Sequence, residues 1–142
     1  MPYSTDVEAA RDLAAKMHEG QLDKAGLPYI THPERVAARM AAPEARVVGW
    51  LHDTVEDTAL TLSEIQARFG PQTAASVDAI SRRAGEAWDD YIERVKADPV
   101  ARQVKISDLI DNSNLGRIPR VTLRDVERQA RYNAALRRLL EE

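Results

Sequence analysis

Apolar residues recur at intervals of three and four along nearly the whole chain, which is the spacing of one face of an α-helix. Residues 5–19 form the first such segment, and Gly20 follows as a C-terminal stop signal. The apolar positions of this segment are Val7, Ala10, Leu13, Ala14 and Met17. Residues 20–31 contain two glycines and one proline without a sustained period, so they are predicted to form a loop.

The remaining helices are indicated mainly by their first residues. Proline suits the first helical position, so helices are predicted to begin at Pro33 and Pro43, the second running to about Asp57. Residues 61–64 read Thr-Leu-Ser-Glu, a capping-box pattern, and the helix after them is predicted to end at Gly70. Further helices are predicted over residues 72–81, over 87–97, from Asp98 onward and from Thr122 onward. Strand alternation and repeats are absent from the sequence, so residues 1–142 are predicted to form one all-α domain, a compact helical bundle.

Composition narrows the classes of function. Hydrophobic residues make up 44% of the chain and charged residues 30%, which is typical of a globular domain. The net charge of −3 offers no broad basic face, so neither nucleic acid nor a membrane surface is expected as a partner. The sequence contains no cysteine, which excludes disulfides and thiolate metal sites. An apolar run of about 20 residues and a secretory signal pattern are both missing, so a cytoplasmic location is expected.

The segment GWLHDTVED, residues 49–57, combines apolar and chemically active side chains. On a helical repeat His52 shares the inward face with Leu51, while Asp53 has Glu56 and Asp57 at its i+3 and i+4 positions. Such carboxylates repel one another and, in the last turn of a helix, also oppose the helix dipole. A divalent cation would reverse the sign of both effects. The simpler alternative is a buried histidine with satisfied hydrogen bonds beside solvated carboxylates.

Two other segments carry compatible groups. His32 stands in Thr-His-Pro, where the predicted loop meets a helix, and Asp108 lies in the otherwise apolar helical segment VKISDLIDN. A carboxylate in apolar surroundings must be paired, hydrogen-bonded or metal-bound, because its desolvation is costly. A set of two histidines and two aspartates suits a six-coordinate metal such as Mn²⁺ or Fe²⁺. The sequence therefore predicts a metal site between separate helices.

Taken in order, THP, LHDTVEDT and VKISDLIDN resemble the hydrolase domain of the Rel/SpoT alarmone enzymes, which belong to the HD superfamily of metal-dependent phosphohydrolases. The segments His18-Glu-Gly-Gln and Lys24-Ala-Gly-Leu-Pro-Tyr-Ile resemble the loop that precedes THP in that family. The resemblance covers roughly residues 10–115 and implies a stand-alone small alarmone hydrolase.

The resemblance implies one Mn²⁺ ion, with another divalent metal as the alternative, and assigns its ligands residue by residue: His32, His52, Asp53 and Asp108. Glu56 and Asp57 match the catalytic pair that positions and deprotonates the attacking water. The implied reaction removes the 3′-pyrophosphate from guanosine tetra- or pentaphosphate, so the expected partner is a small nucleotide.

Substrate contacts are implied for Lys24 and Asn112, and this part of the sequence departs from the family. The family has arginine where this chain has Asp23, which removes a stacking cation and adds negative charge near the phosphates. Residues 108–115 read DLIDNSNL where the family has DRLHNMRT, so Arg117 is the expected replacement for the lost arginine. Phosphoester hydrolysis is therefore a firmer prediction than guanine specificity.

Two alternative functions remain open. One is an HD-domain nucleotidase or phosphatase that acts on another small nucleotide, and the other is a nucleotide sensor without catalytic activity. The helix from Thr122 contains several arginines and is expected to cap the domain, with a homodimer surface as the alternative role.

Overall fold

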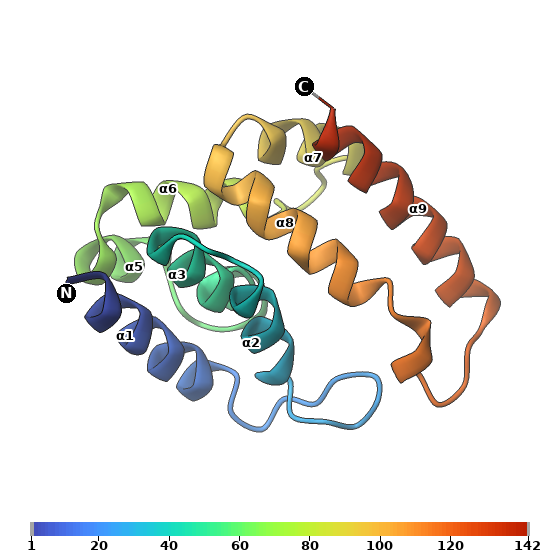
Figure 1. The fold of residues 1–142 in the computed structure, drawn as a ribbon, viewed down its shortest axis with the longest axis horizontal. Coiled ribbons are helices and arrows are strands. Elements are labelled where there is room, and N and C mark those ends of the chain that lie inside the picture. The colour runs from blue at the N-terminus through green and yellow to red at the C-terminus, as the bar shows by residue number, and fades with distance from the viewer. Residues whose placement is uncertain (1, 142) are drawn as a thin grey trace.

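The computed structural model describes residues 2–141, and it confirms the all-α fold (Figure 1). Within this range the only β-pairing is an isolated bridge between Leu22 and Pro28. The α-helices in chain order are α1 Pro2–Met17, α2 Thr31–Ala38, α3 Pro43–Leu51, α4 Thr54–Asp57, α5 Leu62–Phe69, α6 Pro71–Ile80, α7 Trp88–Lys96, α8 Pro99–Asn112 and α9 Leu123–Leu140. A 3₁₀ turn, Leu115–Arg117, lies between α8 and α9.

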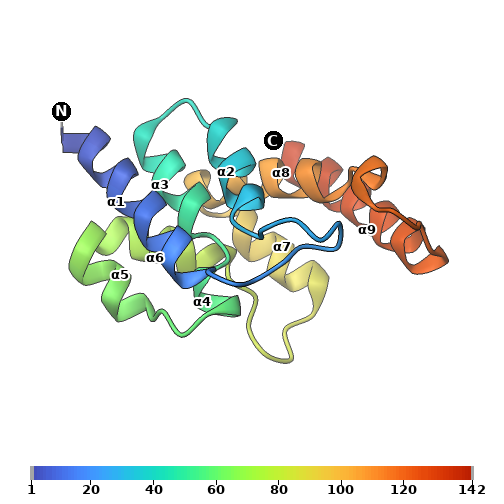
Figure 2. The ribbon, with the colours of Figure 1, turned by 90° about the horizontal axis from the view of Figure 1, so that it is seen from below.

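Helices α3 and α8 form the centre of the fold. Helix α3 packs against α1, α2, α6 and α8, while α8 packs against α2, α3, α6, α7 and α9. Figure 1 shows α8 between the group around α3 and the outer helix α9, and Figure 2 shows α1 and α9 at opposite ends of the molecule. Side chains at the contact between α3 and α8 therefore lie in the interior, where water is excluded.

Capping residues explain several of the observed helix starts. The side chain of Thr61 accepts a hydrogen bond from the backbone N–H of Glu64 at the start of α5, as the sequence predicts. Thr122 and Asp125 form a complete capping box at the start of α9. Asp98 accepts two backbone N–H groups of the first turn of α8. Each such cap is worth about 1 kcal/mol, so these starts are set locally.

Three predictions of helix boundaries are wrong. Helix α1 spans Pro2–Met17 and not residues 5–19. Helix α2 begins at Thr31, two residues before the predicted Pro33. The helix predicted from Pro43 to Asp57 is broken, because α3 ends at Leu51 and the short α4 begins at Thr54.

A side-chain hydrogen bond accompanies this break, and two carboxylates follow it. The Thr54 hydroxyl donates to the Leu51 carbonyl oxygen at 2.7 Å, at the point where the helical path is interrupted. Glu56 and Asp57 are the last two residues of the four-residue helix α4 and do not end a long helix. A single turn aligns few peptide dipoles, so the predicted conflict of these two carboxylates with the dipole of a long helix is reduced.

Helices α2 and α3 approach each other closely at Gly49. A Cβ atom at this position would lie 2.9 Å from the Cα atom of Ala37, a distance that real Cβ contacts do not show. Only glycine therefore allows this crossing. The close approach places the end of α3 beside the start of α2, where the two histidines of interest lie.

Candidate metal centre

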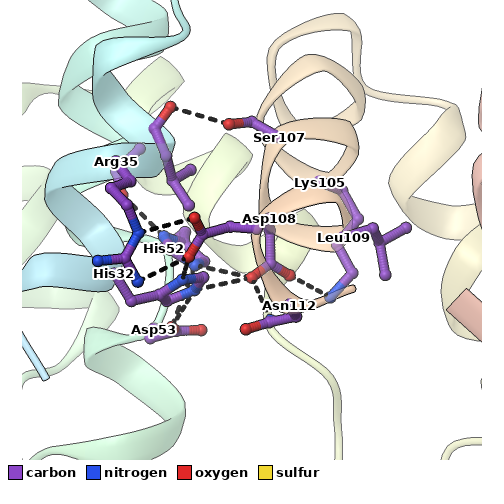
Figure 3. A network of polar contacts seen from close by, with 12 residues as sticks. His32, Arg35, His52, Asp53, Lys105, Ser107, Asp108, Leu109 and Asn112 are labelled. Carbon is purple, nitrogen blue, oxygen red and sulfur yellow. Dashed lines mark hydrogen bonds and ion pairs between the residues drawn. The ribbon is translucent and has the colours of Figure 1, made fainter. Parts of the chain in front are cut away.

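The structure brings the four predicted ligand residues together from three regions of the chain. His32 comes from the first turn of α2, His52 and Asp53 from the break between α3 and α4, and Asp108 from α8 (Figure 3). One potential ligand atom from each residue lies within 4.8 Å of the others. His32 Nε2 is 2.9 Å from Asp108 Oδ1, and His52 Nε2 is 3.0 Å from Asp53 Oδ2. The group is large enough for one cation.

The ring of His52 provides the sharpest test of whether a cation fits. Its Nδ1 lies 2.7 Å from the Gly49 carbonyl oxygen, so Nδ1 carries the proton that makes this hydrogen bond. In the neutral ring Nε2 then has a lone pair directed at the oxygens of Asp53 and Asp108, at 3.0 and 3.4 Å. This buried Nε2 has no hydrogen-bond partner. A lone pair facing two carboxylates requires a positive charge between them, so the donor set fits a divalent metal.

Without a metal, protons supply that charge. Burial disfavours the charged form of His52, but the Asp53 and Asp108 carboxylates outweigh it and raise its pKa well above the usual value. Burial likewise opposes protonation of His32, while hydrogen bonds with Asp108 and Asp111 raise its pKa. A divalent cation would therefore displace protons from both imidazoles when it binds.

Asp111, which is not among the predicted site residues, orients His32. Its Oδ2 lies 2.7 Å from His32 Nδ1, and the carboxylate is almost completely buried. Arg35 donates to both oxygens of the same carboxylate, at 2.8 and 3.0 Å. Despite burial, His32 and Arg35 hold the pKa of Asp111 below its usual range. The carboxylate is thus ionised and keeps the Nδ1 proton in place, which leaves Nε2 of His32 for a metal.

Asp108 is held by partners on its own helix. Lys105 Nζ donates to Oδ2 at 2.8 Å, and Asn112 Nδ2 donates to Oδ1 at 2.9 Å (Figure 3). Burial would raise the pKa of Asp108, but Lys105 and the two histidines lower it well below the usual value. The ammonium of Lys105 also lies over the Tyr91 ring, 5.1 Å from its centroid. Asp108 is therefore a fixed, ionised ligand candidate.

Asp53 lies at the more open side of the group. The Tyr29 hydroxyl donates to its Oδ2 at 2.5 Å, so this tyrosine contacts a candidate ligand rather than only packing in the core. Burial would raise the pKa of Asp53, yet the adjacent His52 lowers it to about 2. The side chain retains 18% of its exposure, against 6% for Asp108. Asp53 is consequently the acidic member of the group that is closest to solvent.

The two predicted catalytic carboxylates follow directly on α4. Glu56 accepts the backbone N–H of Arg82 through one oxygen, and Asp57 makes no hydrogen bond through its carboxylate among the described residues. Burial raises the pKa of Glu56. Burial and the negative charge of Asp53 raise the pKa of Asp57. Carboxylates with raised pKa values beside a metal site are suited to proton transfer.

The predicted substrate contacts lie around a cavity of about 300 Å³ beside His32. Lys24, Asn112 and Arg117 all line it, but each already has a partner. Asn112 binds Asp108, while Arg117 donates to the Asp111 carbonyl oxygen at 2.6 Å. Lys24 lies 3.7 Å from the carboxylate of Asp125 on α9.

Several residues around this site were not anticipated from the sequence. They are Asp111, Lys105 and the α9 residues Arg128, Gln129 and Tyr132, which line the cavity. The position of Lys105, three residues before Asp108 on one helix, was a usable signal for an ion pair. Contacts made by α9 depend on how distant helices pack, so no local pattern could have revealed them.

A comparison with known families identifies the fold. A family model described as an HD domain matches residues 10–88, more than half of the chain. The chain belongs to the HD domain family. HD domains bind divalent metals, which agrees with the candidate group, and the identification confirms the family resemblance seen in the sequence.

Relatives of this HD domain are longer proteins. The chain is 33% identical over 122 residues to a guanosine-3′,5′-bis(diphosphate) 3′-pyrophosphohydrolase of Aquifex aeolicus, covering 78% of this chain and 18% of the relative. It is 41% identical over 80 residues to a GTP pyrophosphokinase of Myxococcus xanthus, covering 54% of this chain and 11% of that protein. The chain thus spans less than a fifth of the length of these curated relatives.

A solved structure also resembles this HD domain. It is that of a metazoan orthologue of SpoT that hydrolyses ppGpp, with a TM-score of 0.80 and 20% sequence identity. The match covers 96% of this chain and 85% of the other. At this identity the likeness shows a shared fold. Over residues 2–141, none of the helices combines the length and apolar character that crossing a membrane requires.

Proposed function

We propose that residues 1–142 form a single phosphohydrolase domain that removes a 3′-pyrophosphate from a purine nucleotide of the guanosine-3′,5′-bis(diphosphate) type. The observation that carries this proposal is the His52 Nε2 lone pair, which faces two carboxylates inside a group of four ligand candidates. The Aquifex aeolicus relative, named for this reaction, supports the choice of substrate.

The metal would be held by His32, His52, Asp53 and Asp108, and we propose one Mn²⁺ ion because the donor set mixes imidazole and carboxylate. When bound, the ion would lower the pKa of a coordinated water and neutralise charge on phosphoryl oxygens. The surrounding residues prepare this site. Asp111 and the Gly49 carbonyl oxygen fix the two imidazoles with Nε2 facing inward, and Lys105 keeps Asp108 ionised.

Glu56 and Asp57 are proposed to act on the attacking water. Asp57 is the better candidate for the base, because its carboxylate is free of hydrogen bonds among the described residues while a backbone N–H occupies Glu56. A base with a raised pKa holds the abstracted proton more firmly at neutral pH. In this assignment Glu56 orients the water through its second oxygen. Lys24, Asn112 and Arg117 are proposed to contact the nucleotide from the cavity wall.

A second candidate function is hydrolysis of another small 3′-phosphorylated nucleotide. It is favoured by Asp23, whose Oδ1 accepts the backbone N–H groups of Ala25 and Leu27 at 2.9 Å each. This carboxylate shapes the loop, and unlike the arginine of the family it has no planar cationic group to stack on a purine. Base recognition must therefore differ from that of the family.

The test is hydrolysis by the purified protein with Mn²⁺ across a panel of nucleotides carrying 3′-phosphates or 3′-pyrophosphates. Release of pyrophosphate from the guanosine 3′,5′-bis(diphosphate) is expected, and Asp53→Ala is expected to abolish it. Glu34→Gln is a suitable control, because Glu34 is an exposed carboxylate of α2 outside the candidate group. Metal binding without turnover of any nucleotide would favour a sensor and reject the enzyme.

A further inference from the structure

A chain of hydrogen bonds connects the end of α1 to the last residue of α4. The Gln21 side-chain Nε2 donates to the backbone carbonyl oxygen of Asp57 at 3.1 Å, and Gln21 Oε1 lies 2.9 Å from His18 Nδ1. His18 is 2% exposed, and Gln21 is half-buried. Figure 2 shows α4 close to the end of α1, from which the chain leads to these two residues. Neither of them belongs to the candidate metal group or lines the cavity beside it.

The carbonyl oxygen of Asp57 determines the direction of this chain. A carbonyl oxygen can only accept, so the Gln21 amide turns its NH₂ group toward Asp57 and its oxygen toward His18. Nδ1 of His18 consequently carries the proton of the second hydrogen bond. The other ring nitrogen of His18, Nε2, is buried and has no hydrogen-bond partner. Within residues 2–141, Gln21 is therefore the one group to which the His18 ring is hydrogen-bonded.

Other contacts fix both residues in place. The His18 ring packs against the Tyr29 ring, with centroids 5.0 Å apart, and the His18 backbone N–H donates to the Ala14 carbonyl oxygen at 2.9 Å. The backbone N–H of Gln21 donates to the His18 carbonyl oxygen at 3.0 Å, and the Gln21 carbonyl oxygen accepts the N–H of Tyr29 at 2.8 Å. The Gln21 side chain thus extends from a backbone that is held at both ends of the loop.

Helix α4 depends on contacts from outside itself. Its four residues form a single turn, which is marginal because nucleation of a helix is unfavourable. The last carbonyl groups of a helix also lack donors within it, and Gln21 supplies one for Asp57. The Asp57 carboxylate makes no hydrogen bond among the described residues, so its position is set through the backbone of α4.

We propose that Gln21 and His18 are positioning residues, which hold Asp57 where its carboxylate can take a proton from the attacking water. This inference rests on the proposed function and extends it, because it assigns a role to two residues outside the metal group and the cavity. Water could replace the half-buried hydrogen bond to Asp57, but it would not fix the direction of α4. Catalytic rates depend steeply on such placement, since an error of about 1 Å can cost about 10²-fold.

The test variant is Gln21→Met, which keeps the length of the side chain and removes both of its hydrogen bonds. The control is Gln66→Met, the same change at an exposed position of α5 whose side chain makes no hydrogen bond among the described residues. Gln21→Met is expected to lower kcat by about 10–100-fold with KM unchanged, while the control keeps the wild-type values.

Two variants of His18 test its part in the chain. His18→Leu, which removes the donor to Gln21, is expected to lower kcat by about tenfold. His18→Asn is expected to restore most of this loss, because its amide nitrogen can take the place of Nδ1. A His18→Asn variant no more active than His18→Leu would overturn the role assigned to His18.

The loop that follows Gln21 offers a competing, purely structural explanation. It carries Lys24, which lines the cavity, and Tyr29, which contacts Asp53. The hydrogen bonds from Asp23 to Ala25 and Leu27 maintain this loop without the Gln21 side chain. If Gln21 served only the loop, Gln21→Met would raise KM or weaken Mn²⁺ binding in a calorimetric titration and leave kcat unchanged. That result would overturn the proposal.

Hydrogen exchange in metal-free protein separates this proposal from the proposed function. The backbone N–H groups of Asp57 and Thr58 donate to the carbonyl oxygens of Asp53 and Thr54 at 3.0 Å each, so their exchange reports on α4. NMR is expected to show about tenfold faster exchange of both groups in Gln21→Met and wild-type rates in Gln66→Met. Faster exchange in a protein that hydrolyses no nucleotide would reject the enzyme and keep the positioning of α4. Unchanged exchange would overturn the positioning itself.

Discussion

The two sides of the candidate metal centre are built differently. On the α2–α8 side, His32, Asp108 and Asp111 are buried, and each of their ring nitrogens and carboxylates has a partner. On the α3–α4 side, His52 has an unpartnered Nε2, and Asp57 has a raised pKa. The first side is held by hydrogen bonds and ion pairs within the protein, whereas on the second side a proton on His52 supplies the positive charge until a cation displaces it. Substitutions on the two sides should therefore have different effects.

The largest expected effect is on catalysis at the α3–α4 side. Asp57→Asn should lower kcat by about 10²–10⁴-fold, because it removes the proposed base. Its unfolding free energy should stay within about 0.5 kcal/mol of wild type, because the carboxylate makes no hydrogen bond among the described residues that the substitution could break. Steady-state kinetics and urea unfolding measure the two quantities. A loss of kcat together with a large loss of unfolding free energy would contradict the expectation that Asp57 affects catalysis and not stability.

At Asp108, on the α2–α8 side, substitution is expected to lower the stability of the fold. Asp108→Ala should lower the unfolding free energy of metal-free protein by about 3–5 kcal/mol, because the Lys105 ammonium would remain buried without its partner. Urea unfolding in the presence of a chelator measures this loss. Asp108→Ala/Lys105→Met should recover part of it, and a double variant as unstable as the single one would refute the explanation.

Substitution of Asp111 tests whether orienting the imidazole of His32 strengthens metal binding. Asp111→Asn should weaken Mn²⁺ affinity by about 10–100-fold, since the neutral amide holds the Nδ1 proton of His32 less firmly. Calorimetric titration with Mn²⁺ measures the affinity directly, independently of turnover. Asp78→Asn is the control, because Asp78 forms a surface ion pair with Arg83 remote from His32. Unchanged affinity in Asp111→Asn would show that the contact is only structural.

The smallest expected effect is on the pH dependence of stability. The folded pKa values of His32 and His52 are raised above the unfolded value of about 6.5. Their contribution is therefore complete below about pH 6.5 and is lost as pH rises through the folded pKa values. Metal-free protein should therefore lose unfolding free energy as pH rises from 6 to 8.5.

Mn²⁺ should reverse this trend, because its binding displaces the same protons and grows tighter as pH rises. Thermal or urea unfolding at matched pH values, with Mn²⁺ and with a chelator, measures both profiles. Parallel profiles in the two conditions would show that the imidazoles are not the groups that a cation replaces.

The sequence predicted the fold where local chemistry sets it. Pro43 at a first helical position and the capping box at Thr61 predicted helix starts that the structure confirms, and so did the start placed at Thr122, whereas the start placed at Pro33 was two residues late. The break after Leu51 was missed because Val55 continues the apolar spacing of α3, and neither glycine nor proline lies between Leu51 and Thr54 to mark a helix end.

The candidate site could likewise be predicted only in part from the sequence. Placement of His32 beside Asp108 was expected from a family resemblance, and the geometry brings them together. The contact of Asp111 with α2 and the position of α9 beside the cavity depend on packing between segments far apart in the chain. Such long-range contacts leave no periodic signal in one sequence, which is why Asp111 was seen only as a departure from the family.

Gly49 links the architecture of this protein to its chemistry at a single position. Its missing side chain lets two helices touch, and its carbonyl oxygen holds the imidazole of His52 in one tautomer. Helix packing and the metal affinity of His52 therefore both depend on this position. A library randomised at position 49 should return the parental amino acid under selection for either property, so engineers who wish to reshape this crossing must redesign Ala37 in the same step.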